Sequence, residues 1–278
     1  MIEVYALACV GFSAVLKILQ RILMQQNLSH HAVLIFYNIA GGILLLPFID
    51  FGSIASLSYY SLGLLCLASA LWLMCDFLHL SALKHIDATQ SEVFGTLRIV
   101  LTVVVGVIVF RDALSLPAIL GILLIVGAML GSTDLKSIEF NRGASLVVLA
   151  TVFGTMALSV DKILLETVDS ATVVLFAFFI PGAILVLRRP AEAKLIWAGL
   201  KQARIIFAIL PVLGVIRYYT MVSAYQLGQL TTVTMILQAT VFVVFLLEIF
   251  FLQQRKMDLK KGASSFLCAV GAGLVAMA

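Results

Sequence analysis

The chain has 278 residues, of which 63% are hydrophobic and 12% are charged, with a formal net charge of +4 at pH 7. A soluble domain carries roughly a quarter charged residues, so 18 Lys and Arg with 14 Asp and Glu are too few to cover a water-exposed surface. This composition excludes an ordinary soluble globular protein and predicts an integral membrane protein surrounded by the lipid bilayer.

Apolar stretches bounded by polar residues, Gly or Pro follow one another along the whole chain. They cover residues 3–25, 31–49, 60–83, 88–110, 114–131, 144–166, 171–187, 203–226, 231–252 and 261–278. A helix needs about 20 mostly apolar residues to cross a bilayer, and these stretches lack the alternation of barrel strands. We therefore expect an all-α polytopic membrane protein with ten transmembrane helices and no room for a soluble catalytic domain.

The two halves of the chain resemble each other at an offset of 141 to 142 residues. The matched segments are Ile35–Leu46 with Phe176–Leu187, Arg21–Leu23 with Lys162–Leu164, and Ser81-Ala82 with Ser223-Ala224. Each half holds five spans, an odd number, so the second half enters the membrane in the opposite sense. We expect two inverted-topology repeats, residues 1–134 and 143–278, with a substrate site near the midplane between them.

Nine ionisable side chains fall at membrane depth: Lys17, Arg21, Asp76, Glu92, Arg98, Asp161, Lys162, Arg217 and Glu248. Each costs at least about 2.5–3.5 kcal/mol on insertion scales, so each needs a partner or a wet cavity. Five are positive and four are negative. They can therefore be interpreted as salt bridges that hold the bundle together, or as the lining of a polar cavity.

The helical positions of the polar residues favour the cavity. In the third span, steps of three and four residues place on one face Ser69, Trp72, Asp76 and His79. Similar polar stripes occur in the first, fourth, sixth, eighth and ninth spans, and they include Lys17, Glu92, Arg98, Lys162, Arg217 and Gln238. Arg217 and Tyr218 stand near the repeat positions of Cys75 and Asp76, so we expect an acid in one half to face a base in the other.

The candidate substrate-binding residues are Trp72, Asp76, His79, Arg98, Arg217, Tyr218 and Gln238. Asp76 with His79 could bind a proton, or Asp76 could form a fixed salt bridge with Arg217 or Arg98. The two arginines could hold a carboxylate or phosphate in bidentate fashion, or pair structurally. An aromatic wall for an organic solute would consist of Trp72, Tyr218, Tyr219 and Tyr225.

The candidate gating or coupling residues are Lys17, Arg21, Glu92 and Lys162. Asp161 and Lys162 diverge by about 100° around a helix, so we expect them to serve different partners. Glu92 lies near its helix start and could simply favour the helix dipole, and we expect Glu248 to pair at the end of its own span. The sequence shows no metal-ligand cluster, hydrolase triad or phosphate loop, and it predicts no metal, no cofactor and no catalytic residue.

The end of the first half resembles a known family. The segments Ala82-Leu83-Lys84-His85, Phe110-Arg111-Asp112-Ala113-Leu114 and Gly121–Gly127 resemble the end of an EamA-type repeat of the drug/metabolite transporter superfamily. The resemblance implies a ten-helix secondary transporter whose fifth and tenth helices give peripheral support or a homodimer contact. Asp112 and Gln254 replace the family's turn glutamate, Ile99 replaces a proline, and Tyr37 and Phe178 stand where an arginine is common.

The basic residues predict an orientation. Twelve Lys and Arg residues flank the odd-numbered loops, against Arg111 alone on the other side. Because positive loops stay in the cytoplasm, the charges place both termini outside, whereas the resemblance implies cytoplasmic termini.

Together these features predict a secondary transporter in the cell inner membrane that works by alternating access. Cavity residues of both signs suit a zwitterion, so an amino acid or related metabolite exporter is the first expectation, driven by proton exchange or by the solute's own gradient. Alternatives are efflux of organic cations or drugs through Asp76 and the aromatics, or transport of a phosphorylated or lipid-linked metabolite through Arg98 and Arg217. A structural protein without transport activity is an alternative of another class. We expect no nucleic-acid partner and no enzymatic activity.

Overall fold

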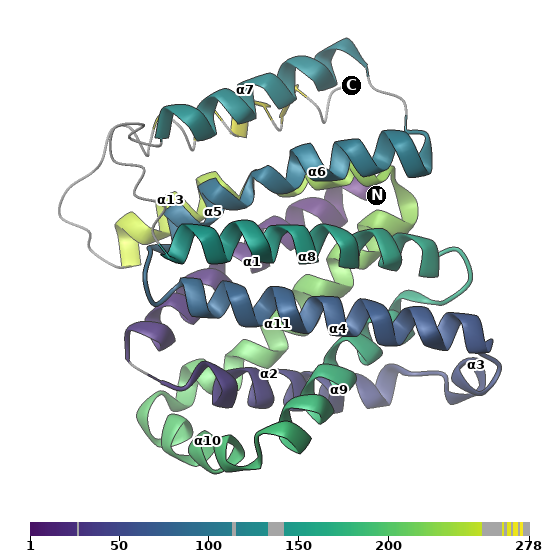
Figure 1. Ribbon diagram of the computed structural model, residues 1–278, viewed down its shortest axis with the longest axis vertical. Helices are drawn as coiled ribbons and strands as arrows, with labels where there is room; N and C mark the ends of the chain where they lie inside the picture. Colours follow the sequence, from purple (N-terminus) through teal and green to yellow (C-terminus); the bar gives the residue numbers. More distant parts are fainter. Residues whose placement is uncertain are drawn as a thin grey trace.

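The computed structural model is an all-α bundle (Figure 1). It describes residues 1–26, 28–112, 115–132 and 142–251, with 263, 266–267, 269–271 and 273–274. The first half contains α1 (Ile2–Gln25), α2 (His30–Leu45), α3 (Phe51–Ala55), α4 (Tyr59–Ala82), α5 (Ala88–Gly95), α6 (Leu97–Val105) and α7 (Leu116–Ser132). The second half contains α8 (Arg142–Leu164), α9 (Ser170–Arg188), α10 (Pro190–Gln202), α11 (Arg204–Leu227), α12 (Leu230–Leu237) and α13 (Thr240–Phe251).

Eight segments of the described chain are helical, long enough and apolar enough to cross a membrane. They coincide with eight of the ten expected spans, and the all-α class is confirmed. The fifth expected span forms α7, which has 17 residues and is about 25 Å long at 1.5 Å per residue. The tenth, 261–278, lies largely outside the described residues.

The fourth and ninth spans are each broken, although each was predicted as one helix. The first break is at Thr96, between α5 and α6, and the second is at Gln238 and Ala239, between α12 and α13. Around the second break four hydrogen bonds reach the carbonyl three residues back rather than four, from the amides of Gln238, Ala239, Val241 and Phe242. Such local tightening often marks a hinge, and Thr96 and Gln238 are 142 residues apart, which is the offset of the repeat.

The helices of the two halves are interleaved. α4 packs along α8 and α1 packs along α11, while α2 crosses α9. These pairings bury one large apolar core that draws on α1, α2, α4, α8, α9, α11 and α12. α7 lies at the outer edge of the bundle, beyond α6 (Figure 1).

Two glycines at matched repeat positions allow α2 and α9 to approach closely. A Cβ atom at Gly41 would lie 2.5 Å from the ring of Phe178 on α9, and one at Gly182 would lie 2.7 Å from Ile39 on α2. Small residues let membrane helices pack backbone to backbone, because lipid provides no hydrophobic drive to bring them together. The crossing therefore depends on the absence of a side chain at both positions.

We expect Gly41→Ala to destabilise the protein by about 1–3 kcal/mol, because the added methyl group overpacks the α2–α9 crossing. The measurement is the thermal unfolding midpoint in detergent. Gly11→Ala is the matched control, since nothing lies within 4 Å of a Cβ at Gly11. Equal midpoints for the two variants would show that the crossing tolerates the methyl group.

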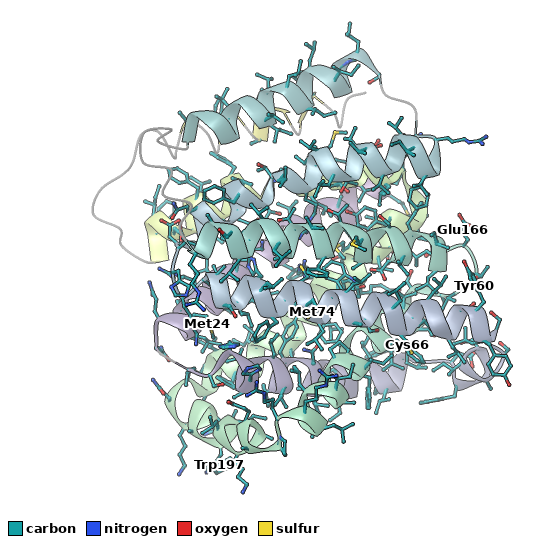
Figure 2. All side chains as sticks on the ribbon, viewed as in Figure 1. Met24, Tyr60, Cys66, Met74, Glu166 and Trp197 are labelled. Carbon is teal, nitrogen blue, oxygen red and sulfur yellow. The ribbon has the colours of Figure 1, made fainter. Side chains whose placement is uncertain are left out.

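The helix α10 occupies a stretch between two expected spans where no helix was predicted. It begins at Pro190, whose fixed φ suits a helix start. Trp197 is 67% exposed (Figure 2), and the Lys201 ammonium lies 5.8 Å from the centre of its ring. Aromatic and basic residues are typical of a helix at a membrane interface. In Figure 1 α10 lies at the lower left and the N-terminus at the right, so they are at opposite ends of the bundle.

Candidate functional site

A polar cavity of about 90 Å³ lies inside the bundle, and we call it the central cavity. Its polar lining includes Ser13, Lys17, Gln20, Tyr37, Trp72, Asp76, His79, Ser91, Glu92, Arg98, Thr151, Arg217, Tyr225, Thr234, Gln238 and Thr240. A side cavity of about 20 Å³ adjoins it, shares Tyr37, Trp72, Asp76 and Arg217 with it, and adds Asn38, Phe178 and Tyr218. Both halves of the chain therefore contribute to one polar interior space.

Most of the candidate residues lie at this space. Six of the seven candidate substrate-binding residues line the central cavity, and the seventh, Tyr218, lines the side cavity. Of the four gating or coupling candidates, Lys17 and Glu92 line the central cavity. Arg21 and Lys162 are among the lining residues of neither cavity.

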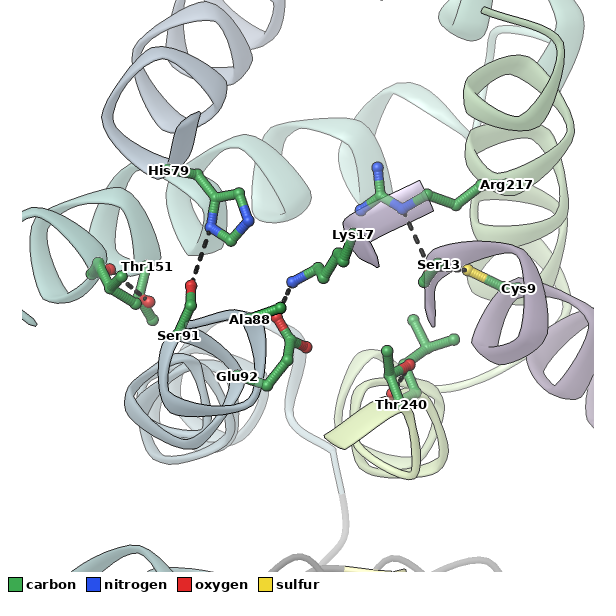
Figure 3. A network of polar contacts seen from close by, with 12 residues as sticks. Cys9, Ser13, Lys17, His79, Ala88, Ser91, Glu92, Thr151, Arg217 and Thr240 are labelled. Carbon is green, nitrogen blue, oxygen red and sulfur yellow. Dashed lines mark hydrogen bonds and ion pairs between the residues drawn. The ribbon is translucent and has the colours of Figure 1, made fainter. Parts of the chain in front are cut away.

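Lys17 and Glu92 form an ion pair at the cavity wall (Figure 3). The pair joins α1 to α5, and its side chains are 19% and 9% exposed. In the described part of the chain, the only other ion pair joins the N-terminal amine to Glu3. Glu92 therefore has a specific cationic partner beyond the favourable helix dipole expected from its place in the sequence.

Three other charges at the cavity are arranged differently. Neither Arg98 nor Arg217 comes within 4.0 Å of the Asp76 carboxylate in the described residues, so the alternative of a fixed salt bridge to Asp76 is not found. Arg217 Nε donates a hydrogen bond of 3.2 Å to Ser13 Oγ (Figure 3). Arg98 Nε is buried without a hydrogen-bond partner among the described residues. These groups retain hydrogen-bonding capacity for a solute.

Two further candidates retain polar atoms at the cavity. His79 Nδ1 lies 3.5 Å from Ser91 Oγ (Figure 3), whereas His79 Nε2 is buried and no described residue offers it a hydrogen-bond partner. Gln238 lines the cavity at the break between α12 and α13. Both residues lie beside the broken spans, so movement at the breaks would change the shape of the cavity.

The aromatic wall differs from the expected one. Trp72 meets Tyr218 edge to face at 5.4 Å, and Phe178 contacts both Tyr218 at 6.2 Å and Tyr37 at 5.2 Å. Tyr219 is 40% exposed and absent from both linings, so its place in the wall was predicted wrongly. It is adjacent to Tyr218, and neighbours in a helix diverge by about 100°.

Tyr225 lines the central cavity and shares a hydrogen bond of 2.9 Å with Thr234 Oγ1. Tyr37 and Phe178 were noticed in the sequence only as positions where the family often has an arginine. Their aromatic character was the available signal for a place in the wall, but aromatics are common throughout membrane helices.

Arg21 and Lys162 bind the ends of helices instead of the cavity. Arg21 donates to the carbonyl of Leu83, just after α4. Lys162 donates to the carbonyls of Tyr225 and Gly228, at 2.6 and 2.8 Å, at the end of α11. Cations at a helix C-terminus satisfy free carbonyls and complement the dipole. Arg21 and Lys162, which lie 141 residues apart, therefore make similar contacts.

Glu248 accepts a hydrogen bond of 2.9 Å from the backbone amide of Ala88. This contact links α13 to the first residue of α5, where a negative charge is favourable. Glu248 was expected to pair at the end of its own span, and this contact with the fourth span was not predicted. Among the described residues, no group of three His, Cys, Asp or Glu side chains could hold a metal ion.

In comparisons with known proteins, residues 1–133 match the EamA-like transporter family, and residues 131–278 match Solute carrier family 35. No curated protein sequence matches the chain. Among the 28 chains of solved structures that match, one described as "Crystal structure of protein" is 12% identical, with a TM-score of 0.71. The alignment covers 99% of this chain and 96% of that one, and at this identity it supports the fold alone.

Proposed function

Because the chain belongs to the drug/metabolite transporter superfamily, as a member of solute carrier family 35, we propose that it moves a small organic solute by alternating access. It is a multi-pass membrane protein and a solute transporter, and its families imply transport instead of catalysis.

The observation that carries the proposal is the set of charges at the central cavity that lack an ion-pair partner in the described residues. Asp76, Arg98 and Arg217 are such residues, and both signs are present. A guanidinium group binds a carboxylate with two parallel hydrogen bonds, and a carboxylate accepts hydrogen bonds from an ammonium group. We therefore propose an amino acid or a related zwitterionic metabolite as the solute.

The size of the cavity supports a small solute. Its volume of about 90 Å³ is below the roughly 300–1,000 Å³ of sites for drug-sized ligands. The charges at the central cavity that lack an ion-pair partner in the described residues are those of two arginines and one aspartate. This excess of positive charge favours a second candidate solute, a phosphorylated metabolite.

Movement is proposed to occur at the two broken spans. We propose that residues 1–134 and 143–278 form the inverted repeats, and that the breaks at Thr96 and Gln238 act as their hinges. Interrupted helices at corresponding positions of two halves are typical of transporters with inverted repeats, and their substrate sites lie beside the interruptions. Arg98 and Gln238 line the cavity at these breaks.

We also propose export across the cell inner membrane, coupled to protons or to the solute's own gradient. The outer face of α7 would meet lipid or the α7 of a second copy. The support is its position at the edge of the bundle and its exposed side chains Leu116, Leu120 and Leu123.

Thermal unfolding of the purified protein with amino acids, organic cations and phosphorylated metabolites tests the proposal. A ligand that binds the folded state alone raises its stability, by about 2.7 kcal/mol at one hundred times Kd. We expect amino acids to raise the midpoint, and Arg217→Gln to remove that effect. Arg204→Gln is the matched control, because Arg204 is exposed at the start of the same helix.

Two results would contradict the proposal that the solute is a zwitterion. A shift by organic cations that disappears in Asp76→Asn would support efflux of cations. A shift by phosphorylated metabolites alone would support the second candidate.

A further inference from the structure

Asp161 is a deeply buried acid that the proposed solute site does not use. It lies in the last turn of α8, and only 1% of its surface is exposed. It belongs to neither cavity lining, but its two hydrogen-bond donors, Trp72 and Tyr218, do. Asp161 therefore contacts the side chains that line the cavities without lining a cavity itself.

The two oxygens of this carboxyl group differ. Trp72 Nε1–H donates to Asp161 Oδ2 at 2.8 Å, and the Tyr218 hydroxyl donates to the same oxygen at 2.6 Å. Asp161 Oδ1 is buried and has no hydrogen-bond partner in the part of the chain that the structure describes. All the hydrogen bonding is concentrated on one oxygen, and the lone pairs of the other remain free.

Among the described residues, no counterion contacts the carboxyl group of Asp161. α8 packs against α4, α5, α6 and α11. The titratable or charged residues that these helices bring to the cavities are Cys75, Asp76 and His79 on α4, Glu92 on α5, Arg98 on α6, and Arg217, Tyr218 and Tyr225 on α11. Lys162 follows Asp161 in α8 but bonds carbonyls at the end of α11. In the described residues no Lys, Arg or His nitrogen lies within 4.0 Å of the Asp161 oxygens.

We propose that Asp161 Oδ1 is a proton-binding site. A buried carboxylate without a counterion is costly, and such groups settle by taking up a proton. Oδ2 already accepts two hydrogen bonds, so the proton goes to Oδ1. The proton comes from a hydronium ion of the surrounding water: one O–H bond of hydronium breaks, one O–H bond forms at Oδ1, a water molecule is released, and the charge of the carboxyl group changes from −1 to 0.

The proton acts on the solute site through the two donors. Ionised Asp161 holds Trp72 and Tyr218 by charge-assisted hydrogen bonds, which are roughly twice as strong as neutral ones. Protonation weakens both bonds and frees the aromatic wall to move. A solute that prefers one arrangement of the wall would shift proton binding, and the proton would shift solute binding by the same factor. This coupling rests on the proposed transport function, whereas the proton site itself does not.

The chain provides a direct probe of this site, because Trp72 and Trp197 are its only tryptophans. Trp197 is 67% exposed on α10, away from the cavities. The variant Trp197→Phe thus leaves Trp72 as the single source of indole fluorescence. Its emission would be recorded on the full-length protein in detergent from about pH 4 to about pH 9, a range that covers perturbed carboxyl groups. No solute is added, so the result is independent of the identity of the transported molecule.

We expect a single pH-dependent change in Trp72 emission in Trp197→Phe, and its loss when Asp161→Asn is added. Asp76→Asn is the matched control, because Asp76 lies one turn from Trp72 on the same helix, whereas the Trp72 indole donates its hydrogen bond to Asp161. The change should persist in that variant. It should move to higher pH in Tyr218→Phe, since the carboxylate loses one of its two donors.

Three results would overturn the proposal: no pH-dependent change in Trp197→Phe, a change that survives Asp161→Asn, or a change abolished by Asp76→Asn. Should Asp161→Asn fail to fold, infrared spectra of the unmodified protein test whether a buried carboxyl group takes up a proton. A buried protonated carboxyl group gives a carbonyl band at low pH that shifts in heavy water, and its absence would refute the site. If the titration belongs to Asp161 but no solute stabilises the protein, the proton site stands and the proposed function fails.

Discussion

Replacing Lys17 with methionine is expected to destabilise the protein by about 3–5 kcal/mol, because it leaves the Glu92 carboxylate buried without its partner. The two side chains lie on the wall of the central cavity and are 19% and 9% exposed. Glu92→Gln should destabilise the protein by a similar amount, because it leaves the Lys17 ammonium group without its partner. The double variant should regain most of the lost stability, since no uncompensated charge remains. Unfolding midpoints of all four proteins in the same detergent give the coupling free energy.

Lys194→Met is the matched control, because Lys194 is exposed on α10 and surface substitutions usually change stability by no more than about 0.5 kcal/mol. If the effects of Lys17→Met and Glu92→Gln simply add in the double variant, the ion pair contributes nothing to the fold. Partial loss with strong rescue would instead place this pair among the contacts that hold α1 against α5.

In the third span, helical periodicity was enough to predict the face that lines the cavity, whereas the polar stripe predicted in the sixth span includes Lys162, which lines neither cavity. The third span places Trp72, Asp76 and His79 at steps of four and three, and all three line the central cavity. Periodicity assigns a residue to a face but does not identify its partner on another helix. Lys17 and Glu92 are 75 positions apart, and nothing in the sequence distinguishes this pair from Asp76 with Arg217. That choice is made by helix packing.

The two broken spans were not predicted from the sequence, for a related reason. Apolar residues continue on both sides of Thr96 and Gln238, and neither position carries a proline to mark a break. The register shared by the two halves was the available signal, because the two positions match at the repeat offset. For Asp161 the sequence indicated membrane depth. Its two aromatic donors come from helices distant in sequence, so only the fold brings them to one carboxylate oxygen.

Arg98 should behave in the opposite way to Lys17. Its Nε is buried with no hydrogen-bond partner in the described part of the chain, and the guanidinium fits beside a glycine, since a Cβ at Gly154 would lie 3.0 Å from Nη2. Removing an unpaired charge relieves a desolvation cost, so Arg98→Gln is expected to leave the unfolding midpoint unchanged or to raise it. If the guanidinium binds an anionic group of the solute, the same change should weaken binding by about 2–5 kcal/mol, at least roughly thirtyfold.

The measurement pairs the thermal midpoint with uptake into proteoliposomes of the solute found by the stability screen. Arg111→Gln is the matched control, because Arg111 is exposed at the far end of the same span. Arg98→Lys should recover only part of the uptake, since an ammonium group cannot reproduce the planar fork of a guanidinium. If Arg98→Gln lowers the folded yield, as is expected for Lys17→Met, Arg98 serves to hold the bundle together. Normal yield with lost uptake would separate the charges that hold the helices together from those left free to bind the solute.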